Sequence, residues 1–473
     1  MFHRTSPYKK RNELQNSQQS NNPILTTMSQ QEQTQPRLGP IEVATVETLS
    51  LDPSVPDLVL ADVFLRQHAK QSTDQQQQPS RVRAFYASSK PERLHFSSTR
   101  QLHAAIVTCG GLCPGLNNVV RAITLTLHHE YHVQRVYGIQ GGWHGFNDKE
   151  YPPMILTPES VDSVHHQGGS FLRTSRGGLD LDKVHTFLTK YQISLLFILG
   201  GDGTHRGAYK VHEHCRVNNL DVAVVGIPKT IDNDIDYIDR SFGFHTAVEA
   251  AQASIRTALV EAKCTVPNGI GVIKLMGREA GFLAAYAALG SGGDVDAVLV
   301  PEVPVVLEGP DGILPFLQRR VLEKGYAVCV VAEGAGQELL EAIQETEKGS
   351  GNKKLPPIAE YVRDEIIKFF VKVGSECRMK YVDPSYSVRS QPANAADSLY
   401  CIQLGTGAVY GAMAGYTGFS VGRVNNRIVY IPIPQLVATS PRFMNPDGDI
   451  WQQILSTTGQ PSPLKKTQSE AEL

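Results

Sequence analysis

The stretch from residue 193 to residue 236 constrains the fold more than any other part of the chain. The apolar run Ile193–Leu199 stops at the glycine-rich turn Gly200–Thr204, and a helical pattern follows. A second apolar run, Val222–Ile227, ends in the aspartate-rich loop Pro228–Asp236. An apolar run, a glycine turn and a helix start are typical of parallel α/β sheets, in which ligands bind at the loops after the strands. We therefore predict an α/β fold with a binding site where these two loops meet.

The residue types in both loops suit phosphate and metal chemistry. Glycines let the backbone approach a polyphosphate closely, a helix N-terminus offers free N–H groups, and Thr204 adds a hydroxyl. Asp202 can hold a magnesium ion against such phosphates. Asp232 and Asp234 lie two residues apart, so only one of them points at a given spot, and one can act as a base while the other supports the water shell of the metal.

Neither loop is decisive alone, because a glycine turn after a strand is most often only a tight turn. The aspartates do not form a calcium loop, since the sixth residue from Asp232 is Tyr237 rather than glycine and the twelfth is Gly243 rather than glutamate. A third loop, Gly110–Asn118, strengthens the phosphate interpretation, because an expected strand at His103–Thr108 precedes it and a helical pattern follows.

Composition excludes several classes of partner. The chain has 473 residues, enough for about two or three domains. Its 45 basic and 47 acidic residues nearly cancel, so neither a nucleic-acid surface nor an anionic membrane is indicated. No apolar run approaches the roughly 18 residues of a membrane span.

Two short patterns resemble metal or redox sites. The seven cysteines are scattered, which suits a reducing compartment, and we expect Cys109 and Cys113 to be inert thiols rather than a redox pair. For the run His212–Cys215 we expect a solvated helix face rather than a zinc site, because residues i and i+2 of a helix point apart.

The loops together identify a family. The four segments G-G-L-C-P-G-L-N, G-G-S-F-L-R-T-S-R, G-G-D-G-T and P-K-T-I-D-N-D-I occur in this order and closely resemble those of 6-phosphofructokinases. The likeness continues through Met276–Arg278, Pro301–Val303, Ala332–Gly334 and Tyr386–Arg389. It covers about residues 100–435, and its detail is most similar to the plant-type ATP-dependent branch.

The resemblance implies transfer of the γ-phosphoryl group of ATP to the 1-hydroxyl of fructose 6-phosphate, which gives fructose 1,6-bisphosphate and ADP. Asp232 would accept the proton, Asp202 would bind Mg²⁺, and Arg176 would offset charge on the transferring group. Arg278 and Arg389 would bind the 6-phosphate. Homotetramers are usual in similar families.

The residues that the resemblance assigns to the nucleotide are Gly111, Arg176, Gly177, Gly201, Asp202, Gly203 and Thr204. The residues that it assigns to the sugar phosphate are Thr230, Ile231, Asp232, Met276, Gly277, Arg278, Glu333, Tyr386, Ser387, Val388 and Arg389. Both sets are expected to face one cleft between two lobes.

Two positions bear on the phosphoryl donor. Lys229 stands where the bacterial ATP-dependent pattern has glycine, and lysine there marks pyrophosphate-dependent relatives. Gly203 stands where those relatives place an aspartate that blocks the nucleotide. We give more weight to Gly203, because a side chain there would occupy the space of the α-phosphate, whereas Lys229 is long enough to swing aside. ATP is therefore the expected donor and pyrophosphate the alternative.

Other departures concern subunit contacts. Gly269 replaces an arginine that bacterial enzymes extend from a neighbouring subunit to the sugar phosphate. Tyr386 replaces the histidine of a His-x-x-Arg motif, and Lys380 replaces an upstream arginine. Contacts to the 6-phosphate across subunits, and a bacterial-style effector site, are therefore open.

We expect two Rossmann-like lobes with largely parallel sheets. A nucleotide-binding lobe would span 99–245, completed by about 390–435, and a sugar-phosphate-binding lobe would span 246–389. Residues 1–98 are of low complexity and are expected to be largely disordered, with a short helix within 55–67 and a disordered tail at 460–473. The basic start of the chain leaves a plastid transit peptide as the alternative to a cytoplasmic location.

Two other classes of function remain open at this stage. NAD kinases and diacylglycerol kinases also contain G-G-D-G-T but lack the P-K-T-I-D-N-D loop. A regulatory subunit that binds a sugar phosphate without turnover is the second alternative, and the retention of Asp202, Thr230 and Asp232 weighs against it.

Overall fold

The computed structural model describes residues 47–48, 63–66, 81–86, 94–96, 101–146, 148–343 and 355–463. All of them belong to one compact unit, residues 41–473. Most of the predicted extension, residues 1–98, and most of the predicted tail lie outside the described residues. Within that extension, Val63–Arg66 forms a strand, so the short helix expected there is wrong for these residues.

The larger of two main sheets has nine strands in the order β2-β3-β15-β14-β8-β7-β4-β5-β6. Its five central strands, β14 to β5 in this order, run parallel, and antiparallel strands complete both edges. The bounds are β2 (Val63–Arg66), β3 (Arg81–Tyr86), β4 (His103–Thr108), β5 (Arg135–Ile139), β6 (Met154–Leu156), β7 (Ile193–Gly200), β8 (Ala223–Pro228), β14 (Phe419–Val424) and β15 (Arg427–Pro432). A separate pair joins β1 (Glu47–Thr48) to β13 (Tyr416–Thr417).

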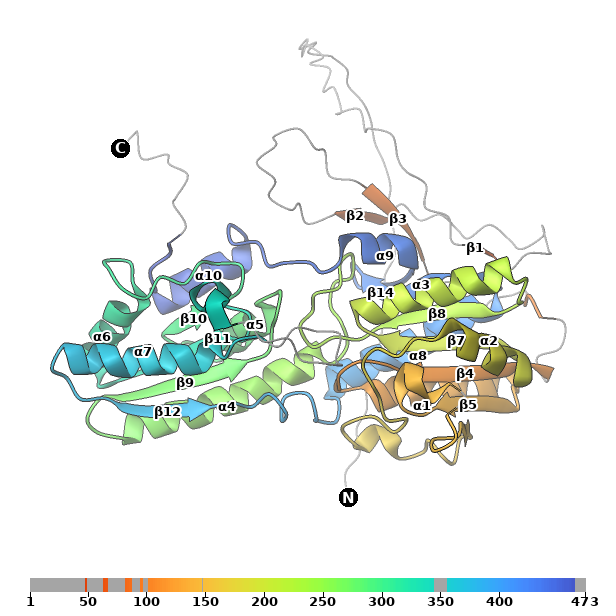
Figure 1. Ribbon diagram of the computed structural model, residues 1–473, viewed down its shortest axis with the longest axis horizontal. Coiled ribbons are helices and arrows are strands. Elements are labelled where there is room, and N and C mark those ends of the chain that lie inside the picture. The colour runs from red at the N-terminus through yellow and green to blue at the C-terminus, as the bar shows by residue number, and fades with distance from the viewer. Residues whose placement is uncertain are drawn as a thin grey trace, which may run out of the picture. The chain divides into compact units, whose positions relative to one another are not determined.

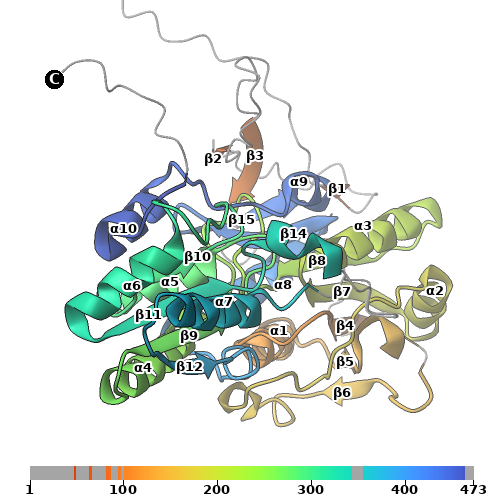
Figure 2. The same ribbon diagram turned by 60° about the vertical axis from the view of Figure 1, so that its left-hand side comes forward.

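Helices cover both faces of this sheet, which explains the continuous apolar runs of its strands. Alternate residues of β4 face opposite cores: Ala104 and Ile106 lie in one cluster, and Ala105 and Val107 lie in the other. On the first face lie α1 (Leu116–Tyr131) and α8 (Ala395–Met413), and on the second lie α2 (Leu181–Lys190), α3 (Asp202–Val217) and α9 (Ile433–Thr439). Figure 2 shows α3 and α2 beside β8 and β7.

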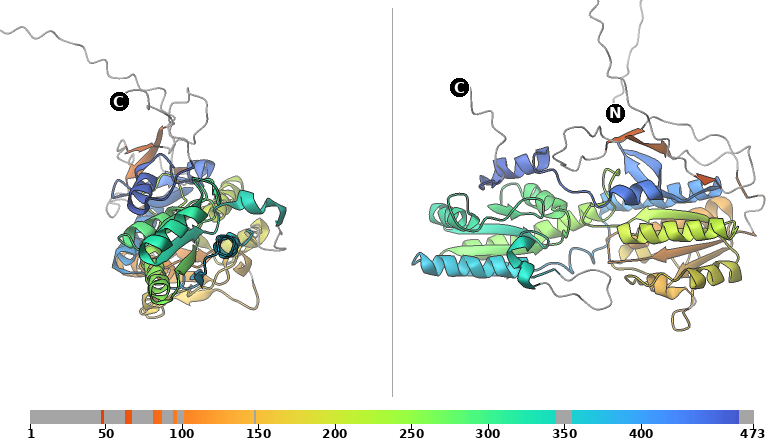
Figure 3. Two further views of the ribbon diagram at one scale, coloured as in Figure 1. Left: turned by 90° about the vertical axis from the view of Figure 1, so that its left-hand side faces the viewer. Right: turned by 45° about the horizontal axis from the view of Figure 1, so that its top comes forward.

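The smaller sheet has four parallel strands in the order β10-β11-β9-β12. Its strands and covering helices are β9 (Gly269–Leu275), β10 (Ala297–Leu299), β11 (Tyr326–Ala332), β12 (Arg378–Val382), α4 (Phe244–Cys264), α5 (Phe282–Gly290), α6 (Ile313–Lys324) and α7 (Ile358–Lys372). The helix α10 (Asp449–Thr458) packs on α5, and three short 3₁₀ helices are η2 (Gly142–Gly145), η3 (Val164–His166) and η4 (Gln337–Ile343). Figure 3 shows α10 above the smaller sheet in its right-hand view.

The two sheets lie side by side in one compact unit, and the chain passes between them three times (Figure 1). It leaves the larger sheet along α4, returns before α8, and crosses again between α9 and α10. The small buried residues of α4 recur at helical spacing and pack against β9 and α5.

The two main sheets confirm the predicted α/β class with largely parallel sheets. The sequence patterns gave no indication of β12 or of the antiparallel pair formed by β14 and β15. The residue boundaries proposed for the two lobes stay a prediction. No helix of the described part of the chain is long and apolar enough to span a membrane.

Candidate active site

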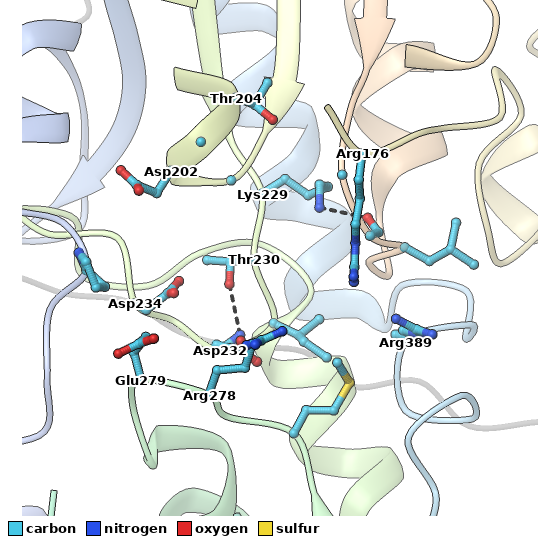
Figure 4. A pocket seen from close by; sticks show the side chains of 18 of the residues that line it. Arg176, Asp202, Thr204, Lys229, Thr230, Asp232, Asp234, Arg278, Glu279 and Arg389 are labelled. Atoms are coloured by element: carbon cyan, nitrogen blue, oxygen red, sulfur yellow. Dashed lines mark hydrogen bonds between the residues drawn. The ribbon is translucent and has the colours of Figure 1, made fainter. Parts of the chain in front are cut away.

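The site is a pocket of about 1520 Å³ that is lined by residues of both sheets. Its walls are the loops that follow β4, β7 and β8 in the larger sheet, together with the ends of β9, β11 and β12 in the smaller one. Parallel strands deliver their carboxyl ends to one edge of a sheet, so loops distant in sequence meet there. Figure 4 shows Asp202, Asp234 and Glu279 on one side of the view and Arg176 and Arg389 on the other.

Most of the residues singled out from the sequence line this pocket. They are Gly111, Arg176, Gly177, Gly201, Asp202, Gly203, Thr204, Lys229, Thr230, Ile231, Asp232, Met276, Arg278, Glu333, Tyr386 and Arg389. Three others do not line it. Val388 is fully buried, Ser387 donates a hydrogen bond to Pro384 O, and Gly277 has φ 129°, where a Cβ would come within 2.5 Å of Ala280 O. These three residues support the loops rather than face the cavity.

Asp202 is the first residue of α3, and Gly201 caps this helix. The Oδ2 atom of Asp202 accepts a hydrogen bond from Nη2 of Arg206, one helical turn away, at 2.9 Å. Its Oδ1 atom is shielded from solvent and has no hydrogen-bond partner among the described residues. Burial raises the pKa of Asp202, and the Arg206 guanidinium opposes that shift. A carboxylate oxygen without a donor at a helix N-terminus fits a divalent cation such as Mg²⁺.

The backbone around Asp202 suits a polyphosphate. The first N–H groups of a helix have no intrahelical acceptor and carry the positive end of the helix dipole. Gly203 is exposed, and a Cβ built there would meet nothing within 4 Å. The open space beside Gly203 is therefore available to a ligand, which agrees with the volume expected for a nucleotide phosphate.

Asp232 lies in the loop after β8, where its N–H donates to Thr230 Oγ1 at 3.1 Å. The residue is partly buried, and its Oδ1 atom has no hydrogen-bond partner in the described part of the chain. Burial raises the pKa of Asp232 to about 8, with further contributions from Asp234 and Glu333, while Lys229 and Arg278 oppose the shift. Such a carboxyl can accept a proton near neutral pH.

Lys229 is tied to the first glycine loop. Its ammonium donates to Gly111 O at 2.7 Å, and the side chain is only 5% exposed. Burial lowers the pKa of Lys229, and Cys113, Cys109 and Asp232 oppose this. We expected Lys229 to swing aside, but its side chain instead links the first glycine loop to the loop after β8.

Cationic side chains reach the pocket from both sheets. A Cβ built on Gly111 would lie 3.6 Å from Arg176 Nη2 and 3.9 Å from Arg389 Nη1, so both guanidinium groups flank the first loop. From the smaller sheet come Arg278 and Lys274, and Lys274 binds Asp383 Oδ2 at 3.1 Å. This distribution suits a ligand with two separate anionic groups.

The sequence did not reveal several pocket residues. Lys274 occupies an ordinary place in a strand pattern, and Asp383 follows β12, which was not predicted. Arg206 and Lys210 stand on the exposed side of a helical pattern. Phe443 lies far along the chain from every motif. Only the tertiary structure brings these residues together.

The short cysteine and histidine patterns are not exposed sites. Cys109 and Cys113 are free and buried, and burial raises the pKa of both thiols, that of Cys109 to about 12. His212 and Cys215 are also buried, so the solvated helix face that we expected is wrong for them, and His212 Nδ1 lies 3.3 Å from Thr417 Oγ1. Among the described residues, no group of three or more potential ligands is placed to hold a metal.

Comparison with known proteins places the chain in a family. The model of the phosphofructokinase family matches residues 103–412. The chain is 45% identical over 370 residues to the chloroplastic ATP-dependent 6-phosphofructokinase 5 of Arabidopsis thaliana, which covers 78% of this chain and 68% of that protein. It is 43% identical over 381 residues to the ATP-dependent 6-phosphofructokinase of Borreliella burgdorferi. The aligned region covers 79% of this chain and 84% of that protein.

Solved structures with the same fold are more distant. The pyrophosphate-dependent phosphofructokinase of Marinobacter aquaeolei matches with a TM-score of 0.61 and 21% identity, over 76% of this chain and 91% of that one. The T-state phosphofructokinase of Pichia pastoris matches with a TM-score of 0.59 and 21% identity, over 76% of this chain and 38% of that longer one. At this identity the structures show the fold alone, whereas the family model and the closer sequences show that the chain belongs to the phosphofructokinase family.

Proposed function

We propose that the protein transfers the γ-phosphoryl group of ATP to the 1-hydroxyl of fructose 6-phosphate, giving fructose 1,6-bisphosphate and ADP. Family membership and relatives named ATP-dependent 6-phosphofructokinase support this activity. The observation that carries it is that Asp202 and Asp232 line one pocket, each with a shielded carboxylate oxygen that lacks a partner among the described residues. One oxygen suits a cation beside phosphates, and the other suits a hydroxyl proton.

Asp232 would accept the proton of the sugar 1-hydroxyl as that oxygen attacks the γ-phosphorus. Phosphoryl transfer requires little covalent chemistry from the protein and depends mainly on in-line positioning and on charge stabilisation. Asp202 would hold Mg²⁺, which supplies neutralisation of phosphate charge when it is bound. Arg176 would offset charge on the transferring group, because its guanidinium lies beside the glycine loop that would carry the donor.

The sugar phosphate would bind on the side of the smaller sheet. Arg278 and Arg389 would hold the 6-phosphate, since planar guanidinium groups fix phosphate oxygens in a defined orientation. Met276, Glu333 and Tyr386 would contact the sugar. We propose the corresponding division of labour between the lobes, with nucleotide on 99–245 and sugar phosphate on 246–389.

Pyrophosphate is the alternative donor, and Lys229 favours it. The structure reduces the weight of Lys229, whose ammonium is engaged by Gly111 O, and the open space at Gly203 supports ATP. A direct test offers ATP or pyrophosphate in parallel to the purified protein with fructose 6-phosphate and magnesium. Product with ATP supports the proposal, and product with pyrophosphate alone would overturn it.

Location and assembly complete the proposal. We favour a cytoplasmic protein, and the chloroplastic relatives support the plastid alternative, which a fluorescent protein fused behind residues 1–98 would distinguish by microscopy.

A homotetramer is expected from the family resemblance, and light scattering of the purified protein measures its mass. Family membership also favours this activity over an NAD or lipid kinase, and turnover by the wild type would exclude a purely regulatory subunit.

A further inference from the structure

Five residues between α9 and α10, Ser440–Met444, form a strap that runs from the larger sheet toward the smaller one. At its far end, the N–H of Met444 donates to Glu302 Oε1 at 2.8 Å, and the same carboxylate accepts from Gly281 N at the start of α5. The strap lies beyond residues 103–412, which the family model matches. Two of its residues, Pro441 and Phe443, line the pocket.

The middle of the strap binds the backbone of the loop that carries Asp232. Arg442 donates from Nε to Asn233 O at 2.8 Å, from Nη1 to Ile238 O at 2.9 Å and from Nη2 to Asp239 O at 3.3 Å. Its own N–H donates to Asp234 O at 2.7 Å. One side chain and its backbone therefore fix the loop at four carbonyl groups.

Ser440 adds a fifth contact and a link to α3. Its Oγ accepts from Asp236 N at 3.1 Å. Its carbonyl accepts from Arg206 Nη2 at 3.5 Å, and Arg206 also binds Asp202. The strap therefore contacts the loop of Asp232 directly and the helix of Asp202 through one arginine.

The loop needs such support, because its backbone is irregular. Asn233 has φ 57° and Tyr237 has φ 65°, both in the left-handed region that non-glycine residues seldom adopt. Backbone of this kind persists only where its surroundings hold it. Asn233 Oδ1 accepts from Ser241 N at 2.9 Å, which is a local brace, whereas the contacts to Arg442 come from about 200 residues away along the chain.

Arg442 is built for this role. It is buried, and burial lowers its pKa, while Asp236 and Asp234 favour the charged form. The guanidinium of Arg442 lies over the ring of Phe282, with its Cζ atom 4.9 Å from the ring centroid. A guanidinium presents a planar fork whose separate nitrogens reach three carbonyls, whereas the three donors of a lysine ammonium all leave one nitrogen on a flexible stem. Arg442 does not itself line the pocket, so it would act through the loop.

We propose that Arg442 is a positioning residue that holds the loop of Asp232 and Asp234 in the geometry needed for phosphoryl transfer. The inference rests on the proposed function for the reaction that is assayed. It assigns a role to a segment outside the matched family region, and it explains why a charged side chain is buried behind the pocket wall.

Arg442→Met removes the donors and keeps an unbranched apolar stem. We expect kcat to fall roughly 10²-fold, as for a displacement of about 1 Å at a reacting group, with KM for ATP and for fructose 6-phosphate little changed. Arg320→Met is the matched control, because Arg320 donates to the buried Asp296 at 2.9 Å and lies outside the pocket. The control should lower the melting temperature without changing kcat.

Arg442→Lys keeps the charge and is the milder variant if Arg442→Met does not fold. Its kcat should stay well below that of the wild type, because the donors of one ammonium nitrogen do not reproduce the spread of Nε, Nη1 and Nη2 over three carbonyls. Full recovery in Arg442→Lys would show that only the charge matters and would overturn the proposal. So would a folded Arg442→Met enzyme with wild-type kcat.

Hydrogen exchange separates a failure of this inference from a failure of the proposed function. In the full-length protein, Arg442→Met or Arg442→Lys should accelerate exchange of the amides in peptides covering residues 233–241, and Arg320→Met should not. This measurement needs no turnover, so it remains decisive even if the wild type does not phosphorylate fructose 6-phosphate. Unchanged exchange in both Arg442 variants would refute positioning, whatever the assays show.

Discussion

Asp202 and Asp232 line the same pocket but are held there by different means. Asp202 begins a helix directly after the cap residue Gly201, and its carboxylate pairs with Arg206 one turn further along the same helix. Asp232 lies in an irregular loop whose backbone carbonyls are bound by Arg442, far along the chain. One carboxylate is therefore placed by local sequence and the other by tertiary structure. The difference shows that a short sequence motif can contain a candidate catalytic residue such as Asp232 without containing the residues that orient it.

The largest effect is expected from Asp232→Asn, which keeps the shape and removes the base. Turnover should fall by roughly 10²–10⁴, the contribution of a general base, while fructose 6-phosphate and ATP still bind. Steady-state kinetics with binding measured by calorimetry would test this. Asp182→Asn, which removes an exposed carboxylate of α2 outside the pocket, is the control and should leave turnover unchanged. A fully active Asp232→Asn enzyme would refute the assignment of the base.

Gly203→Asp tests the local side of the comparison. The new carboxylate would enter open space beside the helix N-terminus, where donor phosphates are proposed to bind. Like charges placed together cost several kcal/mol, so kcat/KM for ATP should fall roughly 10²-fold or more. Gly203→Ala adds only a Cβ and should lose much less. Equal losses in the two variants would show that the size of the side chain rather than its charge matters. Circular dichroism would reveal any change in the fold of either variant.

The sequence predicted the parts of the site that consecutive residues define. A strand, a glycine turn and a helix start are visible in Ile193–Thr204, because their chemistry is local. Lys274 and Asp383 were missed, because they meet only through the parallel pairing of β9 and β12. Arg442 was missed for the same reason, since no pattern around it indicates which backbone it binds.

The resemblance also assigned to the sugar phosphate some residues that do not line the pocket in the structure. Val388 is buried and Gly277 has a backbone conformation that favours glycine, so a motif includes residues that shape a loop as well as residues that face a ligand. Sequence alone does not separate the two groups, because both are needed for the same geometry.

Asp202→Asn should weaken divalent metal binding at least ~10-fold, because the amide removes a charged ligand oxygen. Titration with Mn²⁺ in the presence of ATP, followed by electron paramagnetic resonance, measures this without turnover. Raised Mg²⁺ should restore part of the activity of this variant and none of the activity of Asp232→Asn. Wild-type Mn²⁺ affinity in Asp202→Asn would show that Asp202 does not hold the metal.

Asp232 also predicts how activity and stability respond to pH. Asp232 must be deprotonated to act as a base, and its pKa is raised to about 8, so kcat/KM should rise with pH by about tenfold per unit until the pH approaches that value. A flat profile between pH 6 and pH 8, shown by initial rates at constant ionic strength, would contradict this.

Stability should change with pH in the opposite direction. A carboxyl whose folded-state pKa is raised binds its proton more tightly in the native state, so its contribution to stability is present below the ordinary value of 3.8 and is lost as the pH rises to about 8. Asp232→Asn has no such proton to lose. The melting temperature of the wild type should therefore fall relative to that of Asp232→Asn as the pH rises from about 4 to about 8, and the difference should be constant above that range.

The smallest effect is expected from Arg206→Gln, which removes the ion pair with Asp202. The Arg206 side chain is 53% exposed, so solvent screens the pair, and the free energy of unfolding should fall by at most ~1 kcal/mol. Because α3 and its cap at Gly201 place Asp202, the carboxylate should stay in position, and Mn²⁺ affinity should be equal to or above that of the wild type once the competing guanidinium is gone. Chemical denaturation and the same Mn²⁺ titration measure both quantities. A large loss of metal affinity in this variant would mean that the side chain of Arg206, and not the start of the helix, holds Asp202, and the contrast with Asp232 would then disappear.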